Sequence, residues 1–349
     1  MSASTIVPIR WCGDALELLD QRVLPDRVIR LRVDDATQTA QAITDMVVRG
    51  APAIGITAAY GVVLAAQRAE DNADWPQRLE DAIECLAASR PTAVNLFWAL
   101  ARMREVIDRH RTQRAAPVAA LLDEARGIHQ CDLVDNLAMG HFGSELIARN
   151  GVCTVMTHCN TGALATGGHG TALGVIRSAW SQGLISLVHA NETRPWLQGA
   201  RLTAWELQQE GIPVVLAVDS AASLLLAQGE IGWLIVGADR IAANGDVANK
   251  IGTYALAVQA RHHGVKVMVV APSSTFDLDI ENGVDIPIET RDSRELTHQG
   301  ERRVAPENVK VFNPVFDITP ATLIDAIVCE HGVIEPPNLE SIARLLDRA

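Results

Sequence analysis

The sequence predicts an α/β protein: a helix-rich N-terminal domain followed by a Rossmann-like domain with a mainly parallel, doubly wound sheet. Two observations support this expectation. The 349 residues are 48% hydrophobic but only 4% aromatic, so the core must be mostly aliphatic, as in helices packed on a parallel sheet. Helical periodicity also fills the chain up to about residue 149, whereas short apolar runs alternate with helix-length segments after residue 150.

The N-terminal part begins with a stretch typical of small strands and turns, over residues 9–33. Apolar residues then recur at helical spacing between Thr37 and Val47. A second helix is predicted to begin at Pro52 and a third at Pro91, because proline is favoured in the first turn of a helix. The pattern predicts no strand between this point and about residue 149.

Five apolar runs in the second half have the length of buried strands, and the segments between them have the length of helices. The runs cover residues 152–157, 184–190, 213–218, 232–238 and 265–271. This alternation predicts repeated strand–helix–strand units and therefore a parallel sheet. The chain is long enough for two domains, which we expect at 1–128 and 129–349, although no linker-like composition marks the boundary.

Charge and composition exclude several classes of function. A net charge of −12 and a pI near 5.3 argue against binding to nucleic acids or anionic membranes, which requires an excess of Lys and Arg. The first ten residues lack the apolar core of a signal peptide, and no apolar run reaches the roughly 20 residues of a membrane helix, so we expect a cytoplasmic protein. The six cysteines lack zinc-site or disulfide spacing and are interpreted as reduced thiols without a metal.

Residues directly after the apolar runs are candidate site residues, because ligands bind outside the carboxyl ends of parallel strands. Cys159 follows the run 152–157, next to a glycine-rich turn whose N–H groups would stabilise a thiolate. Asp239 follows the run 232–238, where an apolar surrounding would raise its pKa and suit it to general-acid catalysis. The alternatives are a structural cysteine and, for Asp239, a helix cap or a partner of Arg240.

Three arginines precede prolines that are predicted to start helices. They lie in Arg49-Gly50-Ala51-Pro52, in Arg90-Pro91 and in Arg194-Pro195. A helix N-terminus combined with an arginine fork makes an anion site, so we expect a phosphate-bearing ligand. For each of them, a surface arginine beside an ordinary helix start is the alternative. Asn249 and Lys250 are expected to open a further helix and to bring another cation to a phosphate.

The glycine-rich run 162–174 lies where a dinucleotide fingerprint would lie. Its register differs from that fingerprint, because the third glycine falls at Gly174, one residue too late. Nucleotide binding is therefore kept as an alternative, and no nucleotide cofactor is expected.

Six stretches of the chain match a known family in order and spacing. They are Leu19-Asp20-Gln21 to Pro25, Arg49–Gly55, Ser89–Leu96, Thr157–Gly162, Glu192–Pro195 with Gln198–Thr203, and Gly237–Arg240 running into Asn249–Thr253. On these residues the chain resembles the methylthioribose-1-phosphate isomerases over nearly its whole length. Regulatory subunits of a translation-initiation exchange factor and ribose-1,5-bisphosphate isomerases share their fold, so fold alone does not give activity.

The resemblance implies a homodimeric enzyme of methionine salvage that converts 5-methylthioribose 1-phosphate into 5-methylthioribulose 1-phosphate without metal or nucleotide. It also implies a catalytic pair, Cys159 and Asp239. The implied substrate-binding residues are Arg49, Gly50, Ala51, Arg90, Gln198, Asn249 and Lys250. The alternatives are an isomerase of a 5-deoxy or 5-phospho pentose 1-phosphate and a non-catalytic regulatory subunit.

Overall fold

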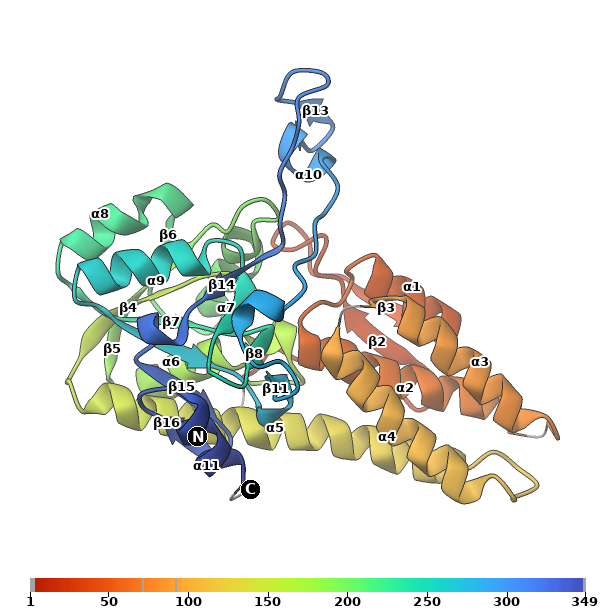
Figure 1. The fold of residues 1–349 in the computed structure, drawn as a ribbon. Coiled ribbons are helices and arrows are strands. Elements are labelled where there is room, and N and C mark those ends of the chain that lie inside the picture. Colours follow the sequence, from red (N-terminus) through yellow and green to blue (C-terminus); the bar gives the residue numbers. More distant parts are fainter. Residues whose placement is uncertain (1–3, 71, 92, 348–349) are drawn as a thin grey trace. The chain divides into compact units, whose positions relative to one another are not determined.

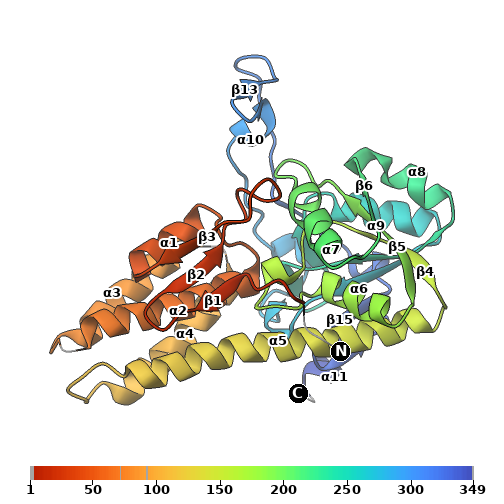
Figure 2. The ribbon, with the colours of Figure 1, turned by 180° about the vertical axis from the view of Figure 1, so that it is seen from behind.

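The computed structural model describes residues 4–347 except 71 and 92, in two compact units (Figures 1 and 2). The first unit comprises Met1–Leu137 and Thr161–Gly174, and the second comprises Ala138–Asn160 and Val175–Ala349. This partition differs from the expected domains 1–128 and 129–349, which stay a prediction about separately folding parts. Thr92, part of one matched stretch, lies outside the described residues.

The first unit combines a small antiparallel sheet with a group of helices. The sheet has the order β1-β2-β3, with β1 at Ile9–Trp11, β2 at Leu16–Leu19 and β3 at Arg30–Val33. The helices are α1 (Ala36–Thr44), α2 (Ala51–Ala69), α3 (Trp75–Ala88), α4 (Val94–His110) and the first part of α5 (Val118–Ala148). Helix α2 packs against α1, α3 and α4 and is apolar on nearly every side, as expected of a helix at the centre of a core.

The predicted helices near Thr37 and Pro52 are confirmed, but two features of this unit differ from expectation. Helix α3 was not predicted, because its apolar residues form only a narrow stripe, such as Trp75 and Leu79, in a highly charged segment. The predicted third helix is confirmed as α4, but its start at Pro91 is wrong, because α4 begins at Val94 and Pro91 lies in the turn before it.

The second unit is built on a seven-stranded sheet with the order β16-β15-β10-β7-β4-β5-β6. Its strands are β4 (Cys153–Thr157), β5 (Ile185–Asn191), β6 (Val214–Ala217), β7 (Ile231–Val236), β10 (Lys266–Val270), β15 (Ala326–Cys329) and β16 (Gly332–Ile334). All neighbouring pairs are parallel except β15 and β16. All five predicted strands are confirmed.

The strand order also confirms the doubly wound topology. From β4 the chain moves outward through β5 to β6, then returns to the other side of β4 and continues through β7, β10 and β15. The direction of winding therefore reverses between β4 and β7. In open α/β sheets this switch point, at the carboxyl ends of the strands, is the usual place for a ligand.

The second unit also contains six helices among the described residues and a hairpin that projects away from the sheet together with the short helix before it (Figure 1). The helices are α6 (Ala172–Ser181, beginning in the first unit), α7 (Ala204–Gln209), α8 (Ala222–Ala227), α9 (Thr253–His262), α10 (Arg294–Thr297) and α11 (Leu339–Leu346). Strands β12 (His298–Gln299) and β13 (Arg302–Arg303) form an antiparallel hairpin. None of the described helices combines the length and the apolar character needed to cross a membrane.

A second, four-stranded sheet in this unit was not predicted. Its order is β11-β8-β9-β14, with β11 at Phe276–Asp277, β8 at Arg240–Ala242, β9 at Val247–Lys250 and β14 at Phe316–Thr319. The expected helix start at Asn249 and Lys250 is wrong, because both residues end strand β9 and helix α9 begins only at Thr253. All four residues of β9 are buried between β8 and β14, so tertiary pairing decides their conformation.

Candidate active site

Cys159 and Asp239 come from the two strands that flank the switch point. Cys159 lies two residues after β4, and Asp239 lies three residues after β7. The two strands are parallel neighbours, with Met156 opposite Leu234, so both loops leave the same edge of the sheet. The fold therefore brings this predicted pair to the carboxyl edge, at the position where α/β proteins bind ligands.

The backbone of Cys159 is held in an unusual conformation. Its φ of 63° lies in the left-handed region, and Thr193, with a φ of 66°, shares this feature. The N–H of Cys159 donates to Thr193 Oγ1 at 2.9 Å, and its carbonyl accepts from Thr203 Oγ1 at 2.5 Å. Thr193 is itself fixed by its N–H, which donates to Asp219 Oδ1 at 2.8 Å. Non-glycine residues in this region cluster at functional sites, because the surrounding structure must hold them there.

Several buried polar atoms at the same edge have no hydrogen-bond partner among the described residues. They are Thr157 Oγ1, His158 Nδ1, both amide atoms of Asn191 and Gln198 Oε1. Native proteins satisfy nearly all such atoms, so a group of them marks a place where a ligand or water completes the bonding. Asn191 and Thr193 were missed as candidate residues, although both follow the apolar run 184–190 and the search along strand ends could have found them.

Gln198 is 5% exposed and precedes the π-helical turn Gly199–Thr203. Glycine is required at position 199, because a Cβ there would lie 1.6 Å from the carbonyl oxygen of Asn191. This close approach fixes Gln198 next to the end of β5. The expected helix start at Pro195 is wrong, because a turn continues through Leu197 and the N–H of Arg194 is bound by Asp219 Oδ2 at 2.7 Å.

Asn249 and Lys250 lie at the buried end of β9. The amide of Asn249 donates to Thr253 Oγ1 at 2.9 Å, and this hydroxyl donates to the carbonyl of Lys250 at 2.7 Å. The ammonium of Lys250 lies 4.8 Å from the centre of the Phe316 ring, within cation–π range. Both side chains are thus positioned by the elements that flank β9.

The turn after Lys250 is tied to the residue beside Cys159. His158 Nε2 lies 2.8 Å from the carbonyl oxygen of Ile251. Burial, the largest cause, lowers the pKa of His158, so the ring is neutral near pH 7. Because a carbonyl only accepts, Nε2 carries the hydrogen and Nδ1 remains as a buried acceptor. His158 therefore connects the end of β4 with the segment that carries Lys250.

Asp239 is partly buried between β7 and β8, and its N–H donates to the carbonyl of Ala248 at 2.9 Å. A helix cap is excluded for this residue, because strand β8 follows it directly. The guanidinium of Arg240 pairs with Asp277 Oδ2 at 3.2 Å. The guanidinium next to Asp239 in the chain is thus held by another carboxylate.

In the first unit, Arg49, Gly50 and Ala51 form the start of α2, as predicted. Arg49 is 9% exposed, and its Nε donates to Gln21 Oε1 at 3.3 Å. Gly50 has a φ of 96° and its Cα approaches Ala165 so closely that a Cβ would lie 2.5 Å from the Ala165 carbonyl oxygen. The backbone of this corner therefore requires glycine.

Arg90 is half-buried and lies between α3 and α4, after the C-cap Ser89. It is not at a helix start, so the helix dipole does not support its proposed binding of phosphate. Its role rests on the matched stretch Ser89–Leu96 alone.

Among the described residues, no group of three or more His, Cys, Asp and Glu side chains is placed to hold a metal ion. Residues 47–336 match the model of the initiation factor 2 subunit family. The chain belongs to this family. All nine predicted site residues lie within the matched region.

Relatives within this family extend the match to the whole chain. The chain is 59% identical to the methylthioribose-1-phosphate isomerase of Pseudomonas paraeruginosa, over 100% of this chain and 98% of that protein. The crystal structure of 5-methylthioribose 1-phosphate isomerase from Pyrococcus horikoshii is 40% identical, with a TM-score of 0.93 over 99% of this chain and 97% of that one. The crystal structure of the translation initiation factor eIF-2B, subunit delta, from A. fulgidus is 41% identical, with a TM-score of 0.89 over 98% of this chain and 100% of that one.

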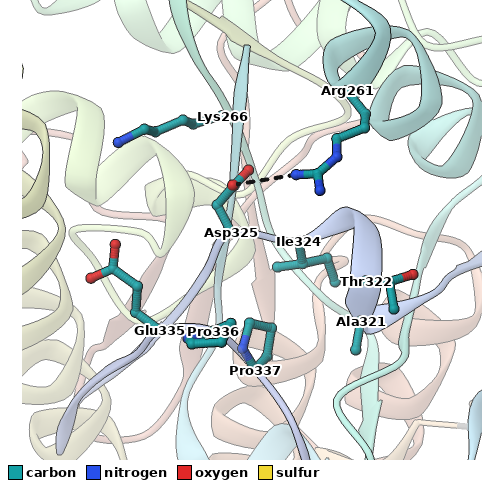
Figure 3. A pocket seen from close by; sticks show the side chains of 9 residues that line it. All are labelled: Arg261, Lys266, Ala321, Thr322, Ile324, Asp325, Glu335, Pro336 and Pro337. Atoms are coloured by element: carbon teal, nitrogen blue, oxygen red, sulfur yellow. Dashed lines mark ion pairs between the residues drawn. The ribbon is translucent and has the colours of Figure 1, made fainter. Parts of the chain in front are cut away.

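A hollow of about 390 Å³ in the second unit lies at the opposite edge of the sheet (Figure 3). Lys266 begins β10 and Asp325 directly precedes β15, so this hollow lies at the amino ends of the strands. Arg261 pairs with Asp325 at 3.9 Å, and the ammonium of Lys266 lies 5.3 Å from the centre of the Trp233 ring. Because its charges are paired and it lies away from Cys159, we do not assign the active site to it.

Asp317 gives the second unit a measurable pH dependence. Its carboxylate accepts from the N–H groups of Gly252 and Tyr254, and burial raises its pKa to about 6. A folded-state pKa above the unfolded one means that the folded protein binds the proton more tightly, so stability from this group falls as the pH rises from about 4 to about 6.

We expect Asp317→Asn to abolish this titration. The free energy of unfolding of the native protein, relative to the variant, should fall by about 2 kcal/mol between pH 4 and 6.5, at 1.36 kcal/mol per pKa unit. Urea unfolding of both proteins across this range measures the difference. Asp325→Asn is the control, since it removes a carboxylate that likewise accepts a backbone N–H, from Val267. A pH-independent difference for Asp317→Asn would contradict the prediction.

Proposed function

We propose that the chain is an aldose–ketose isomerase that converts 5-methylthioribose 1-phosphate into 5-methylthioribulose 1-phosphate, a step of methionine salvage. Identity of 59% over the full length with the Pseudomonas paraeruginosa isomerase supports this assignment. The observation that carries it is the position of a thiol and a carboxyl group, Cys159 and Asp239, in the loops that directly follow the two strands beside the switch point.

The proposed substrate explains why an acid is needed. A phosphate on the anomeric carbon prevents the spontaneous ring opening that ordinary aldose isomerases use, so the ring oxygen must be protonated before the ring can open. Asp239 is the proposed acid, because it follows the apolar strand β7 and its neighbour Arg240 is paired with Asp277. Desolvation in such a place favours the protonated carboxyl group.

After ring opening, a hydrogen must move from C2 to C1. Cys159 would assist this transfer if it proceeds as a proton through an enediolate, and a direct hydride shift between the two carbons is the other route. The buried, strained backbone of Cys159 supports a role that requires a fixed thiol position. We propose no metal or nucleotide cofactor for either route.

The remaining predicted residues are proposed to bind the substrate. They are Arg49, Gly50, Ala51, Arg90, Gln198, Asn249 and Lys250. Because the chain carries a net charge of −12, a phosphate must be held by local cations. Arg49 in the first unit and Lys250 in the second are each proposed as such a cation, and each is largely buried. Burial strengthens such a contact by excluding water from it.

A non-catalytic regulatory subunit is the alternative function, since the A. fulgidus structure named as an initiation-factor subunit is 41% identical. A regulatory subunit has no need of an acid and a thiol at the switch point, and this chain has both. The test is to offer the purified protein three sugars: 5-methylthioribose, 5-deoxyribose and ribose 5-phosphate, each as its 1-phosphate. We expect the highest kcat/KM for the methylthio sugar. A higher value for another sugar would change the substrate, and no turnover of any would favour the regulatory function.

We also propose that the protein is a cytoplasmic homodimer. Strand β6 is an edge of the sheet, and the helices α8 and α9 pack against each other (Figure 1). These three elements and the residue after β6 carry large apolar side chains that are exposed. These are Val215, Leu216, Val218, Leu224, Tyr254 and Val258. An exposed edge strand with apolar neighbours favours association, because its unpaired backbone and apolar area both gain from a partner.

The dimer predicts a clear result in analytical ultracentrifugation. The native protein should sediment as two 37.6-kDa chains, and Leu216→Glu should shift it toward monomer, because a buried charge at the interface is costly. Val284→Glu, at a side chain that is 84% exposed outside this surface, is the matched control. Sedimentation of the native protein at monomer mass would contradict the proposal.

A further inference from the structure

The glycine-rich segment 161–174 is clamped by helix α5 within the first unit. The N–H of Gly167 donates to Asp132 Oδ2 at 2.6 Å, and its carbonyl lies 2.8 Å from His129 Nε2. Because the carbonyl only accepts, Nε2 carries the hydrogen, and Nδ1 accepts from the Tyr60 hydroxyl at 3.3 Å. Burial lowers the pKa of His129, which keeps this neutral form dominant near pH 7. Both polar backbone groups of Gly167 are thus fixed by side chains.

The glycines of this segment have packing reasons that do not involve a nucleotide. A Cβ at Gly167 would lie 2.6 Å from His129 Cδ2. Gly170 has a φ of 93°, and a Cβ there would lie 2.6 Å from the Cα of Gly162. The run that looks like a shifted dinucleotide fingerprint therefore has a steric reason for its glycines within a tightly folded loop.

The clamped segment in turn holds Gln21. The carbonyl of Leu164 accepts from Gln21 Nε2 at 2.7 Å, and the Gln21 backbone N–H donates to Val47 O at 3.1 Å. Gln21 is fully buried, and its Oε1 accepts from Arg49 Nε at 3.3 Å. Since Nε2 only donates and Oε1 only accepts, these two contacts fix the orientation of the amide.

We propose that Gln21 is a positioning residue for Arg49 and that the glycine-rich segment is the anchor that holds Gln21. The proposal rests on the proposed role of Arg49 in binding the substrate phosphate. A contact to Nε sets the plane of the guanidinium, and this plane decides whether the arginine meets a phosphate in its bidentate geometry. Gln21 lies outside the region matched by the family model, and its contacts to Leu164 and Arg49 form without the substrate.

A double-mutant cycle with Gln21→Met and Arg49→Met tests this proposal. Methionine keeps the length of glutamine and removes both contacts of the amide. We expect Gln21→Met to raise KM by about 10-fold and to leave kcat within about 3-fold, because a phosphate contact binds ground state and transition state alike. In the Arg49→Met background, Gln21→Met should change KM little further. The effects of two substitutions on KM are not additive when one residue acts through the other.

The possible outcomes distinguish the positioning role of Gln21 from the proposed role of Arg49 in binding the substrate. Equal effects of Gln21→Met in both backgrounds would overturn the positioning role, and an unchanged KM in Arg49→Met would instead overturn the role of Arg49. Gln67→Met is the matched control, because Gln67 Nε2 also donates to a backbone carbonyl, that of Gly13, at 2.8 Å. If Gln21→Met does not fold, Gln21→Glu enters the same cycle. It keeps the shape and the acceptor for Arg49 but loses the donor to Leu164, and we expect the same rise in KM, again absent in the Arg49→Met background.

Discussion

Asp239→Asn is expected to lower kcat by at least about 10²-fold, with little change in KM, because it keeps the shape of the side chain and removes the acid. The acid must be protonated near pH 7 to deliver its proton to the ring oxygen. Moving a carboxyl group from a pKa of about 3.9 to about 7 requires roughly 4 kcal/mol of differential destabilisation of the charged form. A position after the buried strand β7 supplies desolvation, and the next residue in the chain, Arg240, pairs with Asp277.

Steady-state kinetics of Asp239→Asn measures this effect, and infrared spectroscopy of the carboxyl group in the substrate complex measures its protonation. Asp279→Asn is the control, because it makes the same change of charge at an exposed position of the same unit. A near-normal kcat, or an ionised Asp239 before ring opening, would exclude this residue as the acid. Cys159 would then be the leading candidate.

Cys159→Ser is the second change with a large expected effect. We expect kcat to fall by about 10²- to 10⁴-fold, because serine keeps the backbone contacts but replaces the thiol by a hydroxyl that gives up its proton far less readily. The carbonyl and N–H of residue 159 remain bonded to Thr203 and Thr193 in the variant, so the site should keep its shape. A fall in kcat without unfolding therefore reports the chemistry of the sulfur.

Cys153→Ser is the matched control for this prediction. Cys153 lies in the same strand, β4, and burial raises the pKa of its thiol, as expected of a structural cysteine. We expect the kcat of Cys153→Ser to stay within about 3-fold of the native value, since Cys153 is not among the proposed catalytic or substrate-binding residues. Equal losses of kcat in both variants would show that the effect of Cys159→Ser is structural.

The sequence alone could predict the parallel sheet and the pair at its switch point. Buried parallel strands are continuous apolar runs, and the residue after each run marks the carboxyl edge, so Cys159 and Asp239 could be placed before the structure was available. The sheet that contains β9 could not be predicted in this way. Its four residues Val247–Lys250 end in two polar side chains, and only pairing with β14 shows that they form a strand.

Prolines predicted helix starts less reliably than apolar runs predicted the ends of strands. Pro52 lies in the first turn of α2, as expected, whereas Pro91 and Pro195 lie in turns that precede the next helix. The turn at Pro195 is fixed by a tertiary contact that local sequence does not encode, the bond from the N–H of Arg194 to Asp219. The glycine-rich segment illustrates the same limit, because its contacts to Asp132 and His129 come from a helix about 35 residues earlier in the chain.

The central claim is that this chain isomerises 5-methylthioribose 1-phosphate with its own side chains. The most direct measurement follows ketose formation from that sugar by ¹³C NMR, using purified protein that has been treated with a chelator and dialysed. We expect the native protein to convert the sugar fully to the equilibrium mixture without added metal or nucleotide, and we expect no conversion by Asp239→Asn on the same time scale. Conversion that requires a divalent ion or a nicotinamide, or equal conversion by the variant, would contradict the claim.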